Sequence, residues 1–424
     1  MKAEPLDYVV ITTKNQKFTG LIIPHQENDE IIILKLDNGY NIGINKSSIK
    51  SIKSLKISKK EVKQPRSILK HDKNLKKVVL IHTGGTIASK VDYTTGGVTS
   101  KYSPENLVEL VSELPKIVNI ETDVAADLMS EDINFDDYKK MISTIKKHIK
   151  RCDGIILGHG TDTLAYTSAA LAFAIENPPI PILIVGSQRS SDRPSSDSNM
   201  NLICAARFIA QTDFKGIAIC MHDSINDDKC AILTATKTRK MHTSRRDAFK
   251  AINDKPIALV GNKVEWVKNP ESDENRLKQN ELVVKDKFAD SVGLFKTHPN
   301  MNPKLFEFMT KNYDALVIEA TGLGHMPTNT KENMMNYELL KKFIKKGGII
   351  AITSQCLYGR VHPHVYTNLR RLSSIGCIFC EDMLSETAFI KLSWLMGNYS
   401  AEETKRLLTV NLRGEINDRS LYEE

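Results

Sequence analysis

Two threonine-containing loops carry residue types that could hydrolyse an amide. The first, Thr83-Gly84-Gly85-Thr86, follows the aliphatic run Val78–Ile81, and the second, His159-Gly160-Thr161-Asp162-Thr163, follows Gly154–Gly158. Because glycine adopts backbone conformations closed to other residues, the first loop is expected to present the hydroxyls of Thr83 and Thr86 beside backbone N–H groups. A hydroxyl attacks poorly at neutral pH, so Thr86 is a candidate nucleophile that needs a neighbouring base.

Lysine is the candidate base. The segment Thr234–Phe249 places lysines at the end of a further expected strand, with Lys240 and Lys237 as the two candidates. A desolvated lysine can lose its proton, and an aspartate next to a threonine can orient that lysine, as Asp162 next to Thr161 would. The pattern predicts a nucleophile, a base and an orienting acid.

Each of these features also has a simpler explanation. A glycine turn after a strand is typical of phosphate sites, but no Gly-Lys-Ser/Thr closes this turn and no third glycine follows at dinucleotide spacing. Thr161 could cap the helix expected near Leu164, Asp162 could favour that helix dipole, and Lys240 could be one more solvated cation. The simpler explanation is favoured for each of these three residues taken alone.

The elements that must position these loops alternate between strand and helix. From residue 78 the hydrophobic pattern predicts these strands: Val78–Ile81, Ile117–Thr122, Gly154–Gly158, Ile182–Val185 and Gly216–Met221. Helices are predicted over Ser103–Glu113, Phe135–Lys150, Leu164–Ile175 and Ser198–Gln211. This alternation predicts a parallel sheet with helices on both faces, and such sheets bind ligands at the carboxyl ends of their strands.

The rest of the chain divides into further units. Residues 1–57 contain short alternating strands with an Asn38-Gly39 hairpin turn, which predicts a small β-barrel, and a polar linker follows over 58–77. We expect the catalytic α/β domain at 78–252, an inter-domain connection at 253–290 and a second α/β domain at 291–424. The predicted architecture is two doubly wound parallel-sheet units preceded by the small β-barrel.

Composition restricts the class of protein. The 424 residues exceed one ordinary core, and 41% hydrophobic with 26% charged residues is typical of a globular chain. No apolar run could span a bilayer and no signal peptide is evident, so a cytoplasmic location without membrane partners is expected. Scattered cysteines fit a reducing compartment, and no metal site is expected. The net charge of +8 is compatible with a nucleic-acid partner.

The two threonine motifs, in this order at strand ends, resemble the bacterial-type L-asparaginase family over about residues 78–400. The resemblance implies hydrolysis of the side-chain amide of asparagine or glutamine. It matches Thr86 to the nucleophile, Thr161 and Asp162 to the second threonine and its aspartate, and Lys240 to the base. Lys240 is preferred to Lys237 because its spacing to Asp247-Ala248-Phe249 fits the family, with Lys237 as the alternative.

The resemblance also implies substrate-binding residues. Tyr93 is similar to the tyrosine of the family's mobile loop, and Ser130 with Glu131 is similar to the pair that holds the substrate's α-amino and α-carboxylate groups. Glutamine often follows that serine in the family, so Glu131 departs from the usual form. Its charge suits an α-ammonium and would repel an α-carboxylate at short range.

The N-terminal strands and the segment Lys240–Phe249 together resemble the family of archaeal glutamyl-tRNA(Gln) amidotransferase D subunits. This implies a glutaminase that supplies ammonia to the amidotransferase E subunit, which amidates Glu-tRNA(Gln) with ATP. ATP and Mg are then expected in that partner and no cofactor in this chain, which fits the lack of a Walker-type loop. The family suggests a homodimer core within a heterotetramer, with tRNA(Gln) bound mainly through the complex.

Two alternatives stay open at this point. The first is a free-standing L-asparaginase/glutaminase, since the two substrates differ by one methylene, worth about 1–3 kcal/mol in a pocket. The second is a non-catalytic tRNA-binding or assembly protein on an inactive amidase fold. The presence of every candidate catalytic residue weighs against the second alternative.

Overall fold

The computed structural model describes most of the chain. The described residues are 7–23, 30–36, 41–55, 72–84, 89–91, 98–100, 111, 113–189, 196–269 and 281–420. None of the helices in these ranges combines the length and the apolarity that crossing a lipid bilayer requires.

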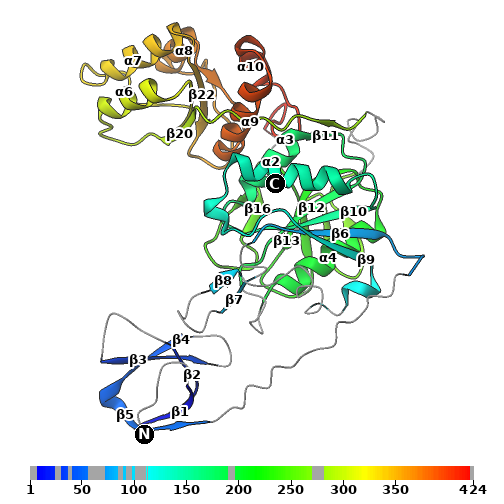
Figure 1. Cartoon of the computed structure of the whole chain (residues 1–424). Coiled ribbons are helices and arrows are strands. Elements are labelled where there is room, and N and C mark those ends of the chain that lie inside the picture. Colours follow the sequence, from blue (N-terminus) through cyan, green and yellow to red (C-terminus); the bar gives the residue numbers. More distant parts are fainter. Residues whose placement is uncertain are drawn as a thin grey trace.

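The N-terminal part is an antiparallel sheet of five strands in the order β4-β3-β2-β1-β5. Its strands are β1 (Tyr8–Thr13), β2 (Lys17–Ile23), β3 (Ile31–Leu36), β4 (Asn41–Asn45) and β5 (Ile49–Ser54). Alternating side chains such as Val9, Ile11 and Leu34 are fully buried on one face. The edge strands β4 and β5 are joined by the 3₁₀ helix Lys46–Ser48, and Figure 1 shows the sheet strongly curled. The expected antiparallel β region is confirmed.

The first α/β unit (residues 72–269) is built on a sheet of eight strands in the order β18-β17-β14-β13-β12-β10-β6-β9. The strands are β6 (Lys77–His82), β9 (Asn119–Val124), β10 (Gly154–Gly158), β12 (Pro181–Val185), β13 (Gly216–His222), β14 (Cys230–Thr234), β17 (Ala258–Val260) and β18 (Val264–Trp266). The five from β9 to β13 pair in parallel, as predicted, whereas β14, β17 and β18 pair antiparallel. Strands β17 and β18 lie in the range expected to be an inter-domain connection, so the first sheet extends into it.

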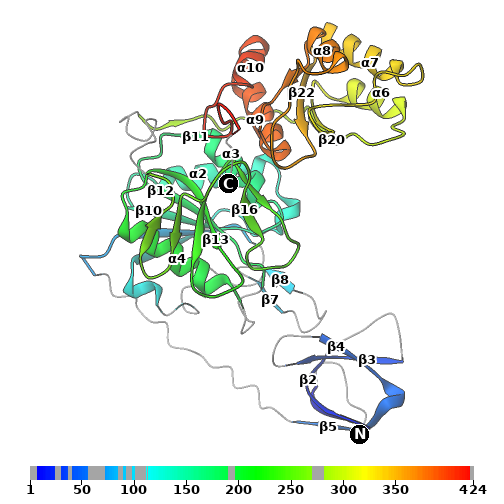
Figure 2. The same cartoon turned by 180° about the vertical axis from the view of Figure 1, so that it is seen from behind.

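Helices cover both faces of this sheet, as Figures 1 and 2 show from opposite sides. The helices are α2 (Phe135–His148), α3 (Leu164–Ala174) and α4 (Ser198–Gln211). Successive strand residues point to opposite faces, so Val79 and Ile81 pack in one core with α2 and α3, and Val78 and Leu80 pack in another with α4. A capping box of Asn134 and Asp137 starts α2.

Three short hairpins or strand pairs lie outside the main sheets. They are β15 (Thr238–Lys240) with β16 (Phe249–Ala251), β7 (Ser89–Val91) with β8 (Val98–Ser100), and β11 (Ile175–Glu176) with β19 (Val283–Val284). The first of these hairpins carries Lys240 at the end of β15.

The second α/β unit (residues 281–420) is a parallel sheet in the order β20-β21-β22-β23. Its strands are β20 (Val292–Lys296), β21 (Ala315–Ala320), β22 (Ile349–Ser354) and β23 (Ile378–Phe379). Its helices are α6 (Pro303–Asn312), α7 (Met334–Lys345), α8 (Thr367–Ser374), α9 (Ser385–Asn398) and α10 (Ala401–Leu407). Helix α9 packs between the units, where the Trp394 ring stacks on Phe173 of α3 at a centroid distance of 5.6 Å. One hydrophobic core therefore joins the two units.

Candidate active site

The turn after β6 forms one side of the candidate site. Gly84 has φ of +102°, and a Cβ there would lie 2.1 Å from the Leu128 carbonyl oxygen, so the close approach of the two loops requires glycine. Thr83 is fully buried, and its hydroxyl donates to the carbonyl oxygen of Gly158 at 2.9 Å. The expectation that Thr83 presents its hydroxyl was therefore wrong: this hydroxyl ties β6 to β10.

The loop after β9 lies against the loop after β10. Ser130 is buried, and the space in front of Gly160 is filled by its side chain, because a Cβ on Gly160 would lie 2.8 Å from the Ser130 hydroxyl oxygen. The Thr163 hydroxyl donates to the Ser130 carbonyl oxygen at 2.6 Å. Glu131 follows with an exposed side chain on the 3₁₀ helix Ser130–Asp132. The ends of β6, β9 and β10 thus meet at one edge of the sheet.

Thr161, Asp162 and Lys240 come together at this edge. The Lys240 ammonium donates to the Thr161 hydroxyl at 2.9 Å and to the Asp162 carboxylate at 2.7 Å, across 79 and 78 residues of chain. Thr161 does not cap α3, because Thr163 occupies the N-cap position. Lys237 is elsewhere: its ammonium donates to the Asp382 carboxylate at 2.6 Å in the second unit.

The exposure of these groups suits chemistry on a ligand. The Lys240 side chain is 15% exposed and the Asp162 side chain 64% exposed, so water and small molecules reach the carboxylate while the lysine is largely covered. A lysine within hydrogen-bond distance of a hydroxyl can exchange a proton with it, and the aspartate fixes the direction of the ammonium. The arrangement can serve as a base and its orienting acid.

His159 stabilises the same loop from inside. Its Nδ1 lies 2.6 Å from the Gly160 carbonyl oxygen, and its Nε2 lies 2.8 Å from the Thr167 hydroxyl. Complete burial lowers the pKa of His159 to about 4. The ring is therefore neutral at physiological pH, donating through Nδ1 and accepting through Nε2, and it acts as an internal brace for the loop.

The end of β12 packs against Thr161. A Cβ on Gly186 would lie 2.9 Å from the Thr161 methyl carbon, so this glycine lets the two strand ends approach. The buried Asp197 carboxylate accepts from the Ser187 hydroxyl at 2.9 Å and from the Gln188 backbone N–H at 3.0 Å. These bonds fix Ser187 and Gln188, which directly follow Gly186.

Some predicted site residues lie outside the described residues. These are the candidate nucleophile Thr86, its neighbour Gly85 and the loop residue Tyr93. The described part of the chain contains no cluster of three or more histidine, cysteine or acidic side chains placed to hold a metal ion. Arg239 was not among the predicted residues; its guanidinium lies 3.2 Å from the Glu386 carboxylate of the second unit. Neighbouring residues in a strand point to opposite faces, so the position of Arg239 next to Lys240 indicates a contact on the other side of the strand.

The chain was compared with known protein families and with known proteins. The family described as "Asparaginase, N-terminal" matches residues 77–272, and "Glutaminase/Asparaginase C-terminal domain" matches residues 291–408. The "GatD N-terminal domain" matches residues 3–55. The glutamyl-tRNA(Gln) amidotransferase D subunit of Thermococcus kodakarensis is 42% identical over 407 residues, 94% of this chain and 90% of that protein.

This chain belongs to the family of glutamyl-tRNA(Gln) amidotransferase D subunits. The D subunits of Sulfolobus acidocaldarius and Methanococcus maripaludis are 39% and 38% identical, covering 98% and 97% of this chain and 92% and 98% of their own lengths. The resemblance to D subunits is thereby confirmed along nearly the whole chain. As a family member, the chain is an amidotransferase enzyme with an asparaginase-type α/β body.

Solved structures confirm the predicted fold class. The thermostable L-asparaginase from Thermococcus kodakarensis is 30% identical, with a TM-score of 0.71 over 80% of this chain and 99% of that one. An L-asparaginase I from Vibrio cholerae is 25% identical, with a TM-score of 0.69 over 81% of this chain and 99% of that one. These two structures cover 80% and 81% of this chain, and the "GatD N-terminal domain" matches residues 3–55.

Proposed function

We propose that this chain is the glutaminase component of a tRNA-dependent amidotransferase. It hydrolyses glutamine and supplies the ammonia with which a partner, the amidotransferase E subunit, converts Glu-tRNA(Gln) to Gln-tRNA(Gln). The observation that carries the proposal is the contact of Lys240 with Thr161 and Asp162 at the strand ends of an asparaginase-type sheet. Membership of the D-subunit family adds the tRNA-linked use of that site.

The proposed reaction uses a threonine nucleophile. Lys240 in its neutral form, oriented by Asp162, takes a proton from Thr161 or a bound water, which in turn takes the proton of the Thr86 hydroxyl as the Thr86 oxygen attacks the carboxamide carbon of glutamine. Backbone N–H groups near the glycine turn and Thr161 stabilise the oxyanion. The C–N bond breaks as the nitrogen gains a proton and leaves as ammonia, and water then hydrolyses the ester on Thr86 to release glutamate.

The remaining substrate contacts come from neighbouring loops. Ser130 lies beside the Thr161 loop, where it could hold an α-group of glutamine, and the exposed Glu131 carboxylate would pair with the α-ammonium. Tyr93 would close over the bound substrate. Each of these roles is carried over from the asparaginase resemblance.

The division of labour follows from the same proposal. ATP and Mg act in the E subunit, this chain binds no cofactor, and tRNA(Gln) is held mainly by the complex. A homodimer of this chain forms the core of a heterotetramer in the cytoplasm. The N-terminal sheet, which matches the GatD N-terminal domain, is the part that a plain asparaginase body lacks.

A second candidate is hydrolysis of free asparagine. It is favoured by the similarity of the α/β body to the L-asparaginase from Thermococcus kodakarensis, at 30% identity and a TM-score of 0.71. The N-terminal sheet and the greater identity to D subunits favour the first candidate.

One assay separates the candidates: glutamine-dependent amidation of Glu-tRNA(Gln) with and without the E subunit, run beside ammonia release from glutamine and from asparagine. We expect Gln-tRNA(Gln) only when the E subunit is present. Asparagine hydrolysis without amidation would favour the second candidate, and tRNA binding without any hydrolysis would favour an inactive assembly protein.

Replacement of the nucleophile gives the matching prediction. Thr86→Val removes the attacking hydroxyl, so ammonia release from glutamine should be abolished while the thermal unfolding midpoint stays near that of the wild type. Thr83→Val serves as the comparison at the other end of the same turn, since its hydroxyl only joins β6 to β10. Full hydrolysis by Thr86→Val would refute the assignment of the nucleophile.

A further inference from the structure

The hairpin that carries Lys240 is not part of either main sheet. Strands β15 and β16 form a two-stranded sheet of their own, in which Lys240 pairs with Phe249. A strand within a large sheet is fixed by hydrogen bonds on both sides, whereas a two-stranded hairpin is only marginally stable by itself. The position of Lys240 therefore depends on what holds this hairpin from outside.

The second unit holds it through successive side chains. The Thr387 hydroxyl donates to the Thr236 carbonyl oxygen at 2.8 Å. The Lys237 ammonium donates to Asp382 at 2.6 Å, and the Arg239 Nε lies 3.2 Å from the Glu386 carboxylate. We call these contacts, between residues 236–239 and residues 382–387 at the start of α9, the β15 clamp. The β15 clamp ends at Arg239, one residue before Lys240, whose ammonium donates to the Thr161 hydroxyl.

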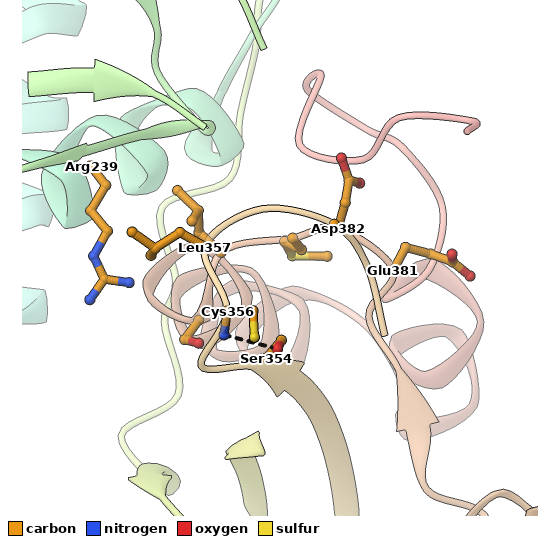
Figure 3. A pocket seen from close by; sticks show the side chains of 10 residues that line it. Arg239, Ser354, Cys356, Leu357, Glu381 and Asp382 are labelled. Carbon is orange, nitrogen blue, oxygen red and sulfur yellow. Dashed lines mark hydrogen bonds between the residues drawn. The ribbon is translucent and has the colours of Figure 1, made fainter. Parts of the chain in front are cut away.

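Arg239 and Lys240 work on opposite sides of β15. Side chains alternate along a strand, so Lys240 faces Thr161 and Asp162 while Arg239 faces the second unit. Figure 3 shows the Arg239 side chain beside Leu357, at the edge of a pocket that both residues line. All other residues that line this pocket belong to the second unit. The arginine thus reaches out of its own unit.

We infer that Arg239 is a positioning residue for Lys240, through which the second α/β unit sets the geometry of the base within the same chain. This deepens the proposed function and rests on it. A lysine side chain is long and flexible, so the place of its ammonium is defined only if its backbone is fixed. Displacement of the second unit, for instance when a partner binds it, would then draw Lys240 away from Thr161 and slow hydrolysis.

Arg239 is the part of the clamp best suited to a test. Its side chain is 33% exposed, so truncation leaves no buried cavity. Because the Glu386 side chain is only 10% exposed, a double variant that also removes this carboxylate serves as the control for a charge left without its partner. Lys237 and Asp382 are 1% and 2% exposed, so breaking that pair would destabilise the whole molecule and obscure any effect on rate.

The test compares Arg239→Ala with wild type in ammonia release from glutamine, with the E subunit and Glu-tRNA(Gln) present. Misplacement of a catalytic group by about 1 Å can cost on the order of 100-fold in rate, so kcat should fall between about 10- and 100-fold while KM stays within about twofold. Arg239→Lys, which keeps a cation facing Glu386, should recover most of the rate. Adding Glu386→Ala to Arg239→Ala should cause no further loss, since both changes break one contact.

A matched control uses another arginine that joins the units. The Arg413 guanidinium lies 3.1 Å from the Glu176 carboxylate, at the far end of α3 from the candidate site. The Arg413 carbonyl oxygen also accepts from the Thr236 hydroxyl of the clamp at 3.2 Å, a bond that Arg413→Ala leaves in place because only the side chain is removed. Arg413→Ala should lower the thermal midpoint about as much as Arg239→Ala but leave kcat unchanged. A purely structural role for Arg239 would make the two variants alike in kcat.

The outcomes separate the inference from the function it rests on. If the wild-type complex releases no ammonia from glutamine, the proposed function fails, and the inference with it. If the wild type is active and Arg239→Ala retains its kcat, or if Arg413→Ala loses as much, the inference alone is overturned.

Discussion

Two lysine–aspartate contacts, formed by lysines three residues apart in the chain, have nearly the same length and opposite surroundings. Lys240 meets Asp162 at 2.7 Å with side chains 15% and 64% exposed, and Lys237 meets Asp382 at 2.6 Å with side chains 1% and 2% exposed. The first contact includes the Thr161 hydroxyl and opens to solvent on the aspartate side. The second is sealed between the two α/β units.

Burial, rather than distance, separates a catalytic candidate from a structural pair. Taking two charges out of water is costly, and the cost is balanced only while both partners are present. A sealed pair cannot exchange a proton with a substrate, whereas a pair open on one side can. Lys240 therefore suits the proposed chemistry, and Lys237 suits the junction of the units. Substitutions at these lysines test this difference.

Lys240→Met should reduce the rate of hydrolysis most strongly. If Lys240 is the base, ammonia release from glutamine should fall by about 10²- to 10⁴-fold, the range that general base catalysis contributes. The free energy of unfolding, measured by urea titration, should change by less than about 1 kcal/mol because Asp162 stays solvated. A variant that keeps more than half of the wild-type rate would break the comparison.

Lys237→Met should act mainly on stability. Removing one member of a buried pair leaves Asp382 as an uncompensated charge, so the free energy of unfolding should fall by about 3–5 kcal/mol. The double variant Lys237→Met/Asp382→Leu should recover much of this loss, because no charge then remains buried without its partner. If the single variant is as stable as the wild type, the junction does not depend on this pair.

A third ion pair, whose two side chains are both exposed, serves as the control. Lys229 contacts Glu265 at 2.7 Å, with side chains 37% and 57% exposed. Its geometry matches the other two, but water screens it, so Lys229→Ala should lower the free energy of unfolding by only about 0.2–1 kcal/mol. A larger loss would mean that burial is not the variable that orders these pairs.

The regular part of the fold was predictable from the sequence. Strand β10 (Gly154–Gly158) and helix α4 (Ser198–Gln211) have the predicted bounds, because a buried aliphatic run and a 3.6-residue period are strong local signals. Strands β17 and β18 were not predicted, since each has only three residues and pairs antiparallel at the sheet edge. Such short strands are stabilised by their neighbours rather than by a pattern of their own.

The candidate site was predictable only in part. The carboxyl ends of parallel strands meet at one edge, which brings Ser130 to Thr163 as the strand order implies. The contact of Lys240 with Thr161 came from the family resemblance, because no local pattern links side chains 79 residues apart. The Thr83 hydroxyl was wrongly expected to face the site. Its position after a strand does not show that it donates to the Gly158 carbonyl oxygen.

The most direct measurement is a search for the ester intermediate. The complex is mixed with glutamine, quenched with acid within the first turnover, digested, and analysed by mass spectrometry for a γ-glutamyl group. We expect this group on the Thr86 hydroxyl in the wild type and none in Thr86→Val. A γ-glutamyl group on a different residue, or rapid turnover with no acylated peptide at all, would contradict it.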